Sequence, residues 1–100
     1  FKASAADADW KNAPGFYMVL TDQPGAQSWP ITGVTYILVQ RSQPDAEKAA
    51  ALLKYFDWCY TAGAVSASRL NYVPLTENVI GQVRAAWAEE IRANGRPVKY

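Results

Sequence analysis

The longest apolar run of the chain covers residues 29–40, in which Tyr36 and the three residues after it form an unbroken apolar group. A run rich in β-branched and aromatic residues is typical of a strand buried on both faces, as in a parallel or mixed sheet covered by helices. Such a strand needs neighbours, because its backbone N–H and C=O groups cannot stay unpaired in a dry interior. No other segment predicts a strand of equal strength, so we interpret the chain as part of a larger fold that holds the remaining strands.

Helical periodicity follows the strand. Pro44 suits the first turn of a helix, and Asp45 and Glu47 place negative charge near the positive end of the helix dipole. Apolar residues then recur at spacings of three and four, which predicts one buried stripe. Its members are Ala49, Leu52, Leu53, Phe56, Cys59 and Tyr60. Gly63 is expected to end this helix, and residues 64–70 predict a shorter one.

A last helix is expected to begin at Thr76, a good N-cap, with Glu77 just inside it. Asn94 and Gly95 are expected to end it. The inner face of this helix is predicted to carry Val79, Ile80, Val83, Trp87 and Ile91. Residues 1–8 are interpreted as the last turns of a helix, residues 16–20 as a short strand or an irregular packed segment, and residues 21–28 as a loop.

Composition removes several classes of function. The net charge is only +1, from ten basic and nine acidic residues, which provides no electrostatic basis for binding nucleic acid or an anionic membrane. Histidine is absent, which removes the usual general base and the commonest metal ligand. With Cys59 as the single cysteine, no internal disulfide is possible. We predict no catalytic, cofactor-binding or metal-ligating residue, and no cofactor.

Three side chains that could in principle take part in catalysis have a simpler explanation. Cys59 lies late in a predicted helix, where the dipole disfavours a thiolate, so we expect a buried and inert thiol. Glu89 and Glu90 are adjacent on a helix and do not face each other, which indicates surface residues rather than a catalytic pair.

Four further polar residues are interpreted as surface, namely Asp7 and Asp9 at a helix end and Arg84 and Arg92 on a solvated helix face. Trp58 and Trp87 occupy helical positions at which core packing is a better explanation than a ligand cleft.

Three segments together resemble one family. They read SWPITGVTYILVQ from Ser28, LLKYFDWCYTAG from Leu52 and LNYVPLTENVIGQVRAAW from Leu70. In this order and spacing they are similar to the C-terminal third of the periplasmic phosphate-binding proteins, the substrate-binding subunits of bacterial phosphate ABC importers. The opening ADADWKNAPGF and the closing GRPVKY extend the resemblance over essentially the whole chain.

The resemblance implies an α/β fold, namely the C-terminal part of a two-lobed type II periplasmic binding protein, mostly helices plus one crossover strand. Residues 1–28 would end the second lobe, residues 29–40 would form the inter-lobe crossover strand, and residues 41–100 would add C-terminal helices to the first lobe. Residues 32–36 are our candidates for the hinge. The family's phosphate ligands lie in loops that no position here matches, so none is transferred.

The implied function is phosphate binding and delivery to the membrane permease subunits of an ABC transporter. The implied location is the periplasm, and the complete protein is expected to be a monomer that binds inorganic phosphate through residues outside this chain. An alternative is a free-standing helical module that binds a partner protein through its aromatic face. An enzyme with a carboxylate-based site is a third hypothesis, which the lack of a convergent acid pair disfavours.

Overall fold

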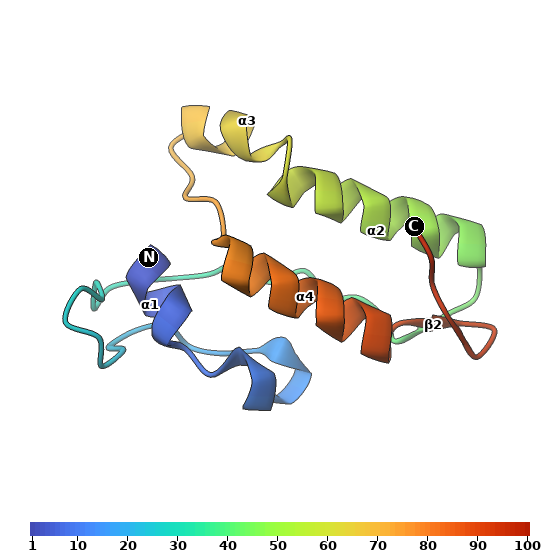
Figure 1. The fold of residues 1–100 in the computed structure, drawn as a ribbon, viewed down its shortest axis with the longest axis horizontal. Coiled ribbons are helices and arrows are strands. Elements are labelled where there is room, and N and C mark those ends of the chain that lie inside the picture. Colours follow the sequence, from blue (N-terminus) through green and yellow to red (C-terminus); the bar gives the residue numbers. More distant parts are fainter. The chain divides into compact units, whose positions relative to one another are not determined.

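Four α-helices, two 3₁₀ turns and three two-residue strands make up the computed structural model, which describes residues 1–100 (Figure 1). Contacts divide the chain into two units. Unit 1 consists of Phe1–Leu38 and Leu75–Val83, and unit 2 consists of Val39–Pro74 and Arg84–Tyr100. Helix α4 (Glu77–Glu90) contributes its first residues to unit 1 and its remaining residues to unit 2. No helix of the chain has the length and apolar character needed to cross a membrane.

The core of unit 1 is built around Trp10. This residue belongs to η1 (Trp10–Asn12), which follows α1 (Lys2–Asp7), and it is almost completely buried. Its indole N–H donates to the carbonyl of Ala5 at 2.7 Å, and its ring stacks on Phe16 at a centroid distance of 5.3 Å. Buried residues from three parts of the unit complete this core, and they are Ala5, Ala8, Leu20 and Val79.

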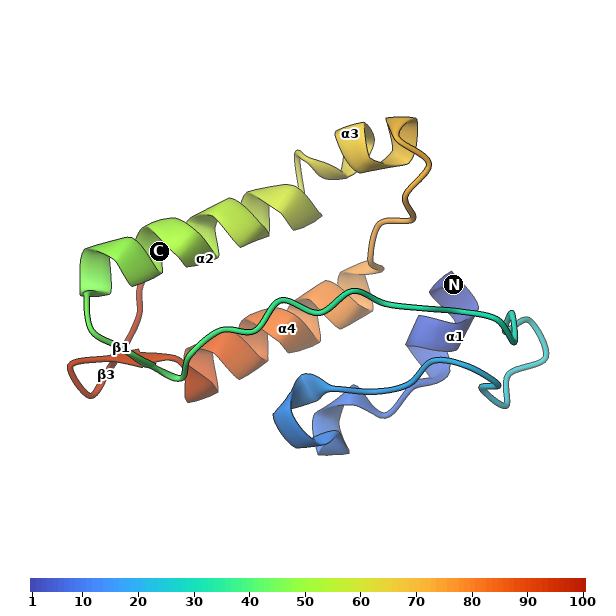
Figure 2. The ribbon, with the colours of Figure 1, turned by 180° about the vertical axis from the view of Figure 1, so that it is seen from behind.

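The strand predicted over residues 29–40 is absent as a paired element. These residues form no helix and no ladder, and Figure 2 shows them as a long run of chain without a regular element. The physical reason is the one that the sequence already indicated, since a strand is defined by hydrogen bonds to a neighbour and no neighbour is present. Residues 16–20 likewise form no strand, and Phe16 belongs to the 3₁₀ turn η2 (Pro14–Phe16).

In unit 2, helix α2 (Ala46–Tyr60) begins two residues later than predicted, so Pro44 precedes the helix and does not belong to its first turn. Asp45 is its N-cap, and its side chain accepts hydrogen bonds from the backbone N–H groups of Glu47 and Lys48 at 2.9 and 3.0 Å. The predicted stripe is only partly buried. Ala49 and Leu53 are buried, whereas Leu52 is exposed. The buried face of α2 is therefore narrower than predicted. A helix that is covered on one side buries only part of its surface, and the apolar residues of α2 extend beyond that part.

Helix α2 ends at Tyr60 and is followed by α3 (Ala64–Arg69), which confirms the shorter predicted helix to within one residue. Gly63 lies between the two helices and donates its N–H to the carbonyl of Trp58 at 2.8 Å. A Cβ atom at this position would lie 3.0 Å from the Cα atom of Cys59, so the connection requires a small residue.

The two ends of α4 differ from the prediction. Thr76 precedes the helix as expected, but its hydroxyl is buried without a hydrogen-bond partner, so it does not cap the helix with its side chain. Asn94 and Gly95 do not end the helix, which stops earlier, at Glu90. Both have positive φ angles, 52° and 75°, and they connect β2 (Arg92–Ala93) to β3 (Arg96–Pro97).

This Asn-Gly turn therefore belongs to a β-hairpin, for which it is the typical two-residue connection. The middle strand β2 also pairs in parallel with β1 (Ser42–Gln43), so the small mixed sheet has the order β1-β2-β3. Ile91, predicted for the helix face, instead lies buried between the end of α4 and the start of β2.

Alanine substitutions at two glycines are predicted to change the free energy of unfolding in opposite directions. Gly95 has a φ angle of 75°, so Gly95→Ala should destabilise the chain by about 1 kcal/mol, because a Cβ atom disfavours this region. Gly81 lies inside α4 with no neighbouring atom within 4 Å of an added Cβ, so Gly81→Ala should stabilise by about 0.5–1 kcal/mol. Urea unfolding measures both. A Gly95→Ala variant as stable as the unmodified chain would contradict the assigned turn, and a destabilised Gly81→Ala variant would contradict the placement of Gly81 in α4.

The capping contact of α2 predicts a dependence on pH. Backbone hydrogen bonding from Lys48, the largest cause, lowers the pKa of Asp45 from its ordinary value of 3.8. A lowered pKa in the folded state means that ionised Asp45 stabilises the fold above its unfolded pKa, and that this stabilisation is lost as pH falls through the folded pKa. Asp45→Asn keeps an acceptor without the titration, so unfolding followed from neutral to acidic pH should show a smaller loss of stability in the variant. Parallel curves would contradict the role of Asp45.

Candidate functional site

The hinge candidates, residues 32–36, lie in an uncharged part of the chain, and buried and exposed residues alternate along them. From Gln23 to Gln40 the chain contains no Asp, Glu, Lys or Arg. Within unit 1, Thr32, Val34 and Tyr36 are buried or half-buried, while the intervening Gly33 and Thr35 are exposed. This period of two is that of a strand with one covered face. We call residues 32–38 the unpaired segment.

Tyr36 fixes the middle of the unpaired segment. Its hydroxyl donates to the carbonyl of Met18 at 2.5 Å and accepts from the N–H of the same residue at 3.1 Å. The ring of Tyr17 lies against it at a centroid distance of 5.0 Å. One side chain therefore satisfies both backbone groups of Met18, as a neighbouring strand would otherwise do.

The start of the segment is held by a second polar contact. The hydroxyl of Thr32 donates to the carbonyl of Trp29 at 2.8 Å, which turns the chain locally before the segment begins. The hydroxyl of Ser4, in α1, donates to the same carbonyl at 3.4 Å. The hinge candidates, residues 32–36, thus begin and end at residues whose side chains are held by hydrogen bonds, Thr32 and Tyr36.

A shallow groove of about 200 Å³ lies between this segment and residues 17–20. Its lining residues are Tyr17, Met18, Val19, Leu20, Thr32, Gly33, Val34 and Tyr36. None of them is charged, and the hydroxyls of Thr32 and Tyr36 are already used for backbone carbonyls. The groove therefore offers no cation for the charge-assisted hydrogen bonds by which proteins commonly hold a phosphate oxyanion.

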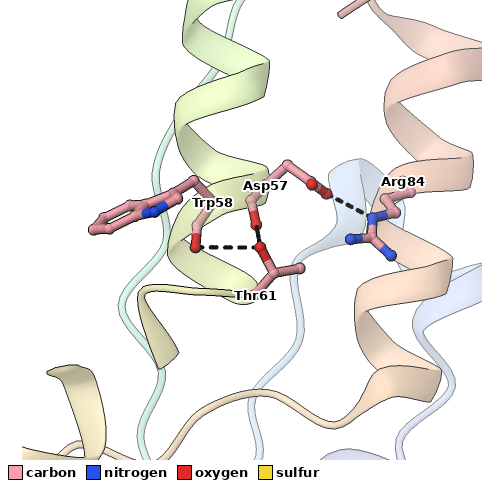
Figure 3. A network of polar contacts seen from close by, with 4 residues as sticks. All are labelled: Asp57, Trp58, Thr61 and Arg84. Carbon is pink, nitrogen blue, oxygen red and sulfur yellow. Dashed lines mark hydrogen bonds and ion pairs between the residues drawn. The ribbon is translucent and has the colours of Figure 1, made fainter. Parts of the chain in front are cut away.

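Arg84, in unit 2, is paired rather than solvated, which corrects the sequence expectation. Its Nε atom donates to Oδ1 of Asp57 at 2.6 Å, as Figure 3 shows. The hydroxyl of Thr61 donates to the carbonyls of Asp57 and Trp58 at 2.8 and 3.4 Å, so the ion pair lies at the C-terminal end of α2. This arrangement neutralises Arg84 and joins α2 to α4 within unit 2, so it is structural.

An aromatic cluster within unit 2 surrounds Trp87. Its ring stacks on Tyr60 at 6.0 Å, is tilted against Phe56 at 6.4 Å and meets Tyr100 edge-on at 6.0 Å. Burial is the largest cause that raises the pKa values of Tyr60 and Tyr100 from their ordinary value of 10.0. Core packing was predicted for both Trp58 and Trp87. The prediction fits Trp87, but it is wrong for Trp58, which is 52% exposed.

Arg92 is not on the last helix, as the sequence suggested, but in β2, where its Nη1 atom donates to the carbonyl of Ala88 at 2.7 Å. It thereby satisfies a free carbonyl at the end of α4, a role that cations commonly fill. Glu90 is at the surface, as expected, and pairs with Arg41 at 2.8 Å. Asp9 caps η1, and Asp7 accepts from the hydroxyl of Ser28 at 3.2 Å.

The single cysteine is half-buried rather than buried. A hydrogen bond with Cys59 is the largest cause that raises the pKa of Tyr55, its neighbour one turn earlier on α2. No group of three or more acidic or cysteine side chains is placed to hold a metal ion. The polar and cysteine side chains considered in the sequence analysis therefore do not come together in a reactive site. The unpaired segment is the part of the chain for which a function, that of a hinge, is expected.

The contact of Tyr36 can be tested by matched substitutions. Tyr36→Phe removes both bonds to Met18 and leaves two partly buried backbone groups without a partner, so it should destabilise by about 1–3 kcal/mol. Tyr17→Phe is the control, because Tyr17 is 59% exposed and its hydroxyl makes no hydrogen bond, so its effect should stay within about 0.5 kcal/mol. Thermal unfolding separates the two. Equal stability of both variants would contradict the anchoring role.

No family model matches the chain. Comparison with curated proteins finds clear relatives. The chain is 41% identical to the phosphate-binding protein PstS of Xylella fastidiosa (strain Temecula1) over 92 residues, which cover 92% of the chain and 25% of that protein. The corresponding protein of Pasteurella multocida is 38% identical over 94 residues, which cover 94% of the chain and 27% of that protein.

A third PstS, from Haemophilus influenzae, is 33% identical over 92 residues, which cover 92% of the chain and 28% of the relative. The chain thus spans about a quarter of the length of these relatives, and the resemblance noted in its sequence is confirmed. It is homologous to the PstS phosphate-binding proteins, a family of binding proteins and not of enzymes.

Proposed function

We propose that these 100 residues are the C-terminal portion of the solute-binding protein of a bacterial phosphate ABC importer. The observation that carries the proposal is the 41% identity to a phosphate-binding protein along 92% of the chain. Under this proposal residues 1–28 end the second lobe of a two-lobed type II binding protein, residues 29–40 cross between the lobes, and residues 41–100 add helices to the first lobe.

The phosphate ligands of such a protein would lie outside this chain. Two of the arginines that the sequence singled out are already engaged, Arg84 with Asp57 and Arg92 with backbone carbonyls. The groove beside the unpaired segment has no charged lining. These contacts suit a scaffold role, in which the present residues support a binding cleft that other residues complete.

Within that scaffold we assign residues 32–36 to the hinge. Hinges absorb changes in φ and ψ at a few positions while the flanking structure stays fixed. Gly33 and Thr35 are exposed between the fixed residues Thr32 and Tyr36, and an added Cβ at Gly33 would meet no atom within 4 Å. Glycine also permits φ and ψ values that other residues disfavour, which supports the assignment.

The partners follow from the same proposal. The complete protein would bind inorganic phosphate in the periplasm, act as a monomer and deliver its ligand to the permease subunits in the membrane. Reversible capture of an oxyanion needs no acid–base or redox group, which agrees with a chain without histidine or a metal cluster.

One observation favours the alternative, a helical interaction module. The outer face of α2 carries Tyr55 and Trp58, both more than half exposed and stacked on each other at 6.2 Å. Adjacent exposed rings of this kind are enriched at protein interfaces. The alternative and the main proposal differ in whether a complete gene product binds phosphate.

Calorimetry with inorganic phosphate distinguishes them. The complete gene product that contains this segment should bind phosphate with a stoichiometry of about one and with submicromolar affinity. The 100-residue chain alone should release no heat beyond dilution, because it lacks the ligands. Submicromolar binding by the chain alone would overturn the assignment of the ligands to other residues, and a complete product without phosphate affinity would overturn the proposed function.

A further inference from the structure

We propose that the hydroxyl of Tyr36 acts as a latch on the hinge, and that its two hydrogen bonds to Met18 exist in only one of the two lobe arrangements, open or closed. The inference rests on the proposed function and extends its hinge assignment, because it names the contact that must break when residues 33–35 rotate. Tyr36 is a positioning residue under this proposal, since it acts through the backbone of Met18 and not on phosphate.

Both ends of the hinge are held by unit 1. At its start, Thr32 donates to the carbonyl of Trp29 at 2.8 Å, and that carbonyl also accepts from a hydroxyl of α1 at 3.4 Å. At its end, Tyr36 donates to the carbonyl of Met18 at 2.5 Å and accepts from its N–H at 3.1 Å. Only the φ and ψ angles between these contacts can turn, and a short chain with both ends fixed allows only small, compensating changes. Residues 33–35 therefore cannot absorb a large rotation while both contacts persist.

The residues between these two contacts are weakly held. No backbone hydrogen bond involves residues 33–35, and Gly33 and Thr35 are exposed. A Cβ atom added at Gly33 would have no atom within 4 Å. Of the three residues, only Val34 packs against the core of unit 1. The contacts at the two ends therefore determine whether the hinge can turn.

Of the two end contacts, that of Tyr36 is the one that must break. The bond of Thr32 spans three residues, so it moves together with its own short stretch of chain. The bonds of Tyr36 join positions 18 apart and tie the crossover to Met18, within the residues assigned to the second lobe. A groove of about 200 Å³, lined by both residues, lies at this contact, so water can satisfy the backbone groups of Met18 after the hydroxyl leaves. The contact can therefore open and re-form without leaving a backbone group unpaired.

The test uses the complete gene product that contains this segment. Tyr36→Phe removes the hydroxyl from the lobe arrangement that contains the latch and leaves the other arrangement unchanged, so it shifts the equilibrium between them. Calorimetry with inorganic phosphate should show a dissociation constant that differs by about threefold or more from that of the unmodified protein. Tighter binding places the latch in the open arrangement and weaker binding places it in the closed one, and both results support the proposal.

The control is Tyr17→Phe, whose ring lies against that of Tyr36 at 5.0 Å but whose hydroxyl makes no hydrogen bond, so the affinity should stay unchanged. If Tyr36→Phe is folded by circular dichroism and binds phosphate as the unmodified protein does, the latch is overturned. An equal shift in Tyr17→Phe would also overturn it, since ring packing would then be the cause. An unmodified protein without phosphate affinity would instead overturn the proposed function, and the latch with it.

Hydrogen exchange in the complete, unmodified protein provides a second measurement that needs no variant. The amide of Met18 donates to the hydroxyl of Tyr36 at 3.1 Å, whereas the amide of Asp22 donates to the carbonyl of Pro30 at 3.1 Å, outside the hinge. Saturation with phosphate should change the exchange rate of the Met18 amide by about threefold or more relative to that of the Asp22 amide, because the latch exists in only one lobe arrangement. A ratio of the two rates that is the same with and without phosphate would overturn the latch.

Discussion

One hydroxyl group determines how residues 32–38 are placed in unit 1. Tyr36 donates to and accepts from the backbone of Met18, so the two neighbouring lengths of chain are joined through a side chain instead of through a β-ladder. The same contact holds the two segments that line the groove, residues 17–20 and residues 32–36, beside each other.

The sequence predicted the helices of unit 2 well because their signals are local. Asp45 caps α2 through atoms within three residues of it, and Ala64–Arg69 forms the short helix that follows Gly63. The prediction of the end of α4 was wrong because this end depends on contacts that are distant in the sequence. Asn94 and Gly95 were interpreted as the end of a helix, but an Asn-Gly pair is also the strongest short hairpin signal, and pairing of β2 with the distant β1 accompanies the hairpin.

Side-chain burial was harder to predict than helix position. Leu52 and Trp58 have the spacing of a core stripe, yet both are exposed, because spacing alone does not give the width of the surface that covers a helix. The ion pair of Arg84 with Asp57 joins residues 27 positions apart, so no local pattern reveals it. The expectation that no reactive site exists came from composition, which needs no knowledge of contacts.

The placement of the indole rings has a spectroscopic consequence. Trp10 is buried in the core of unit 1, with its N–H bonded to a carbonyl, whereas Trp87 lies in the aromatic cluster of unit 2. The two rings therefore have different environments, in one case an apolar core and in the other a set of tyrosines and a phenylalanine. With Trp29 and Trp58 exchanged for phenylalanine, the emission of the chain would come from one internal reporter in each unit, and the loosening of either unit could be followed optically without any attached dye.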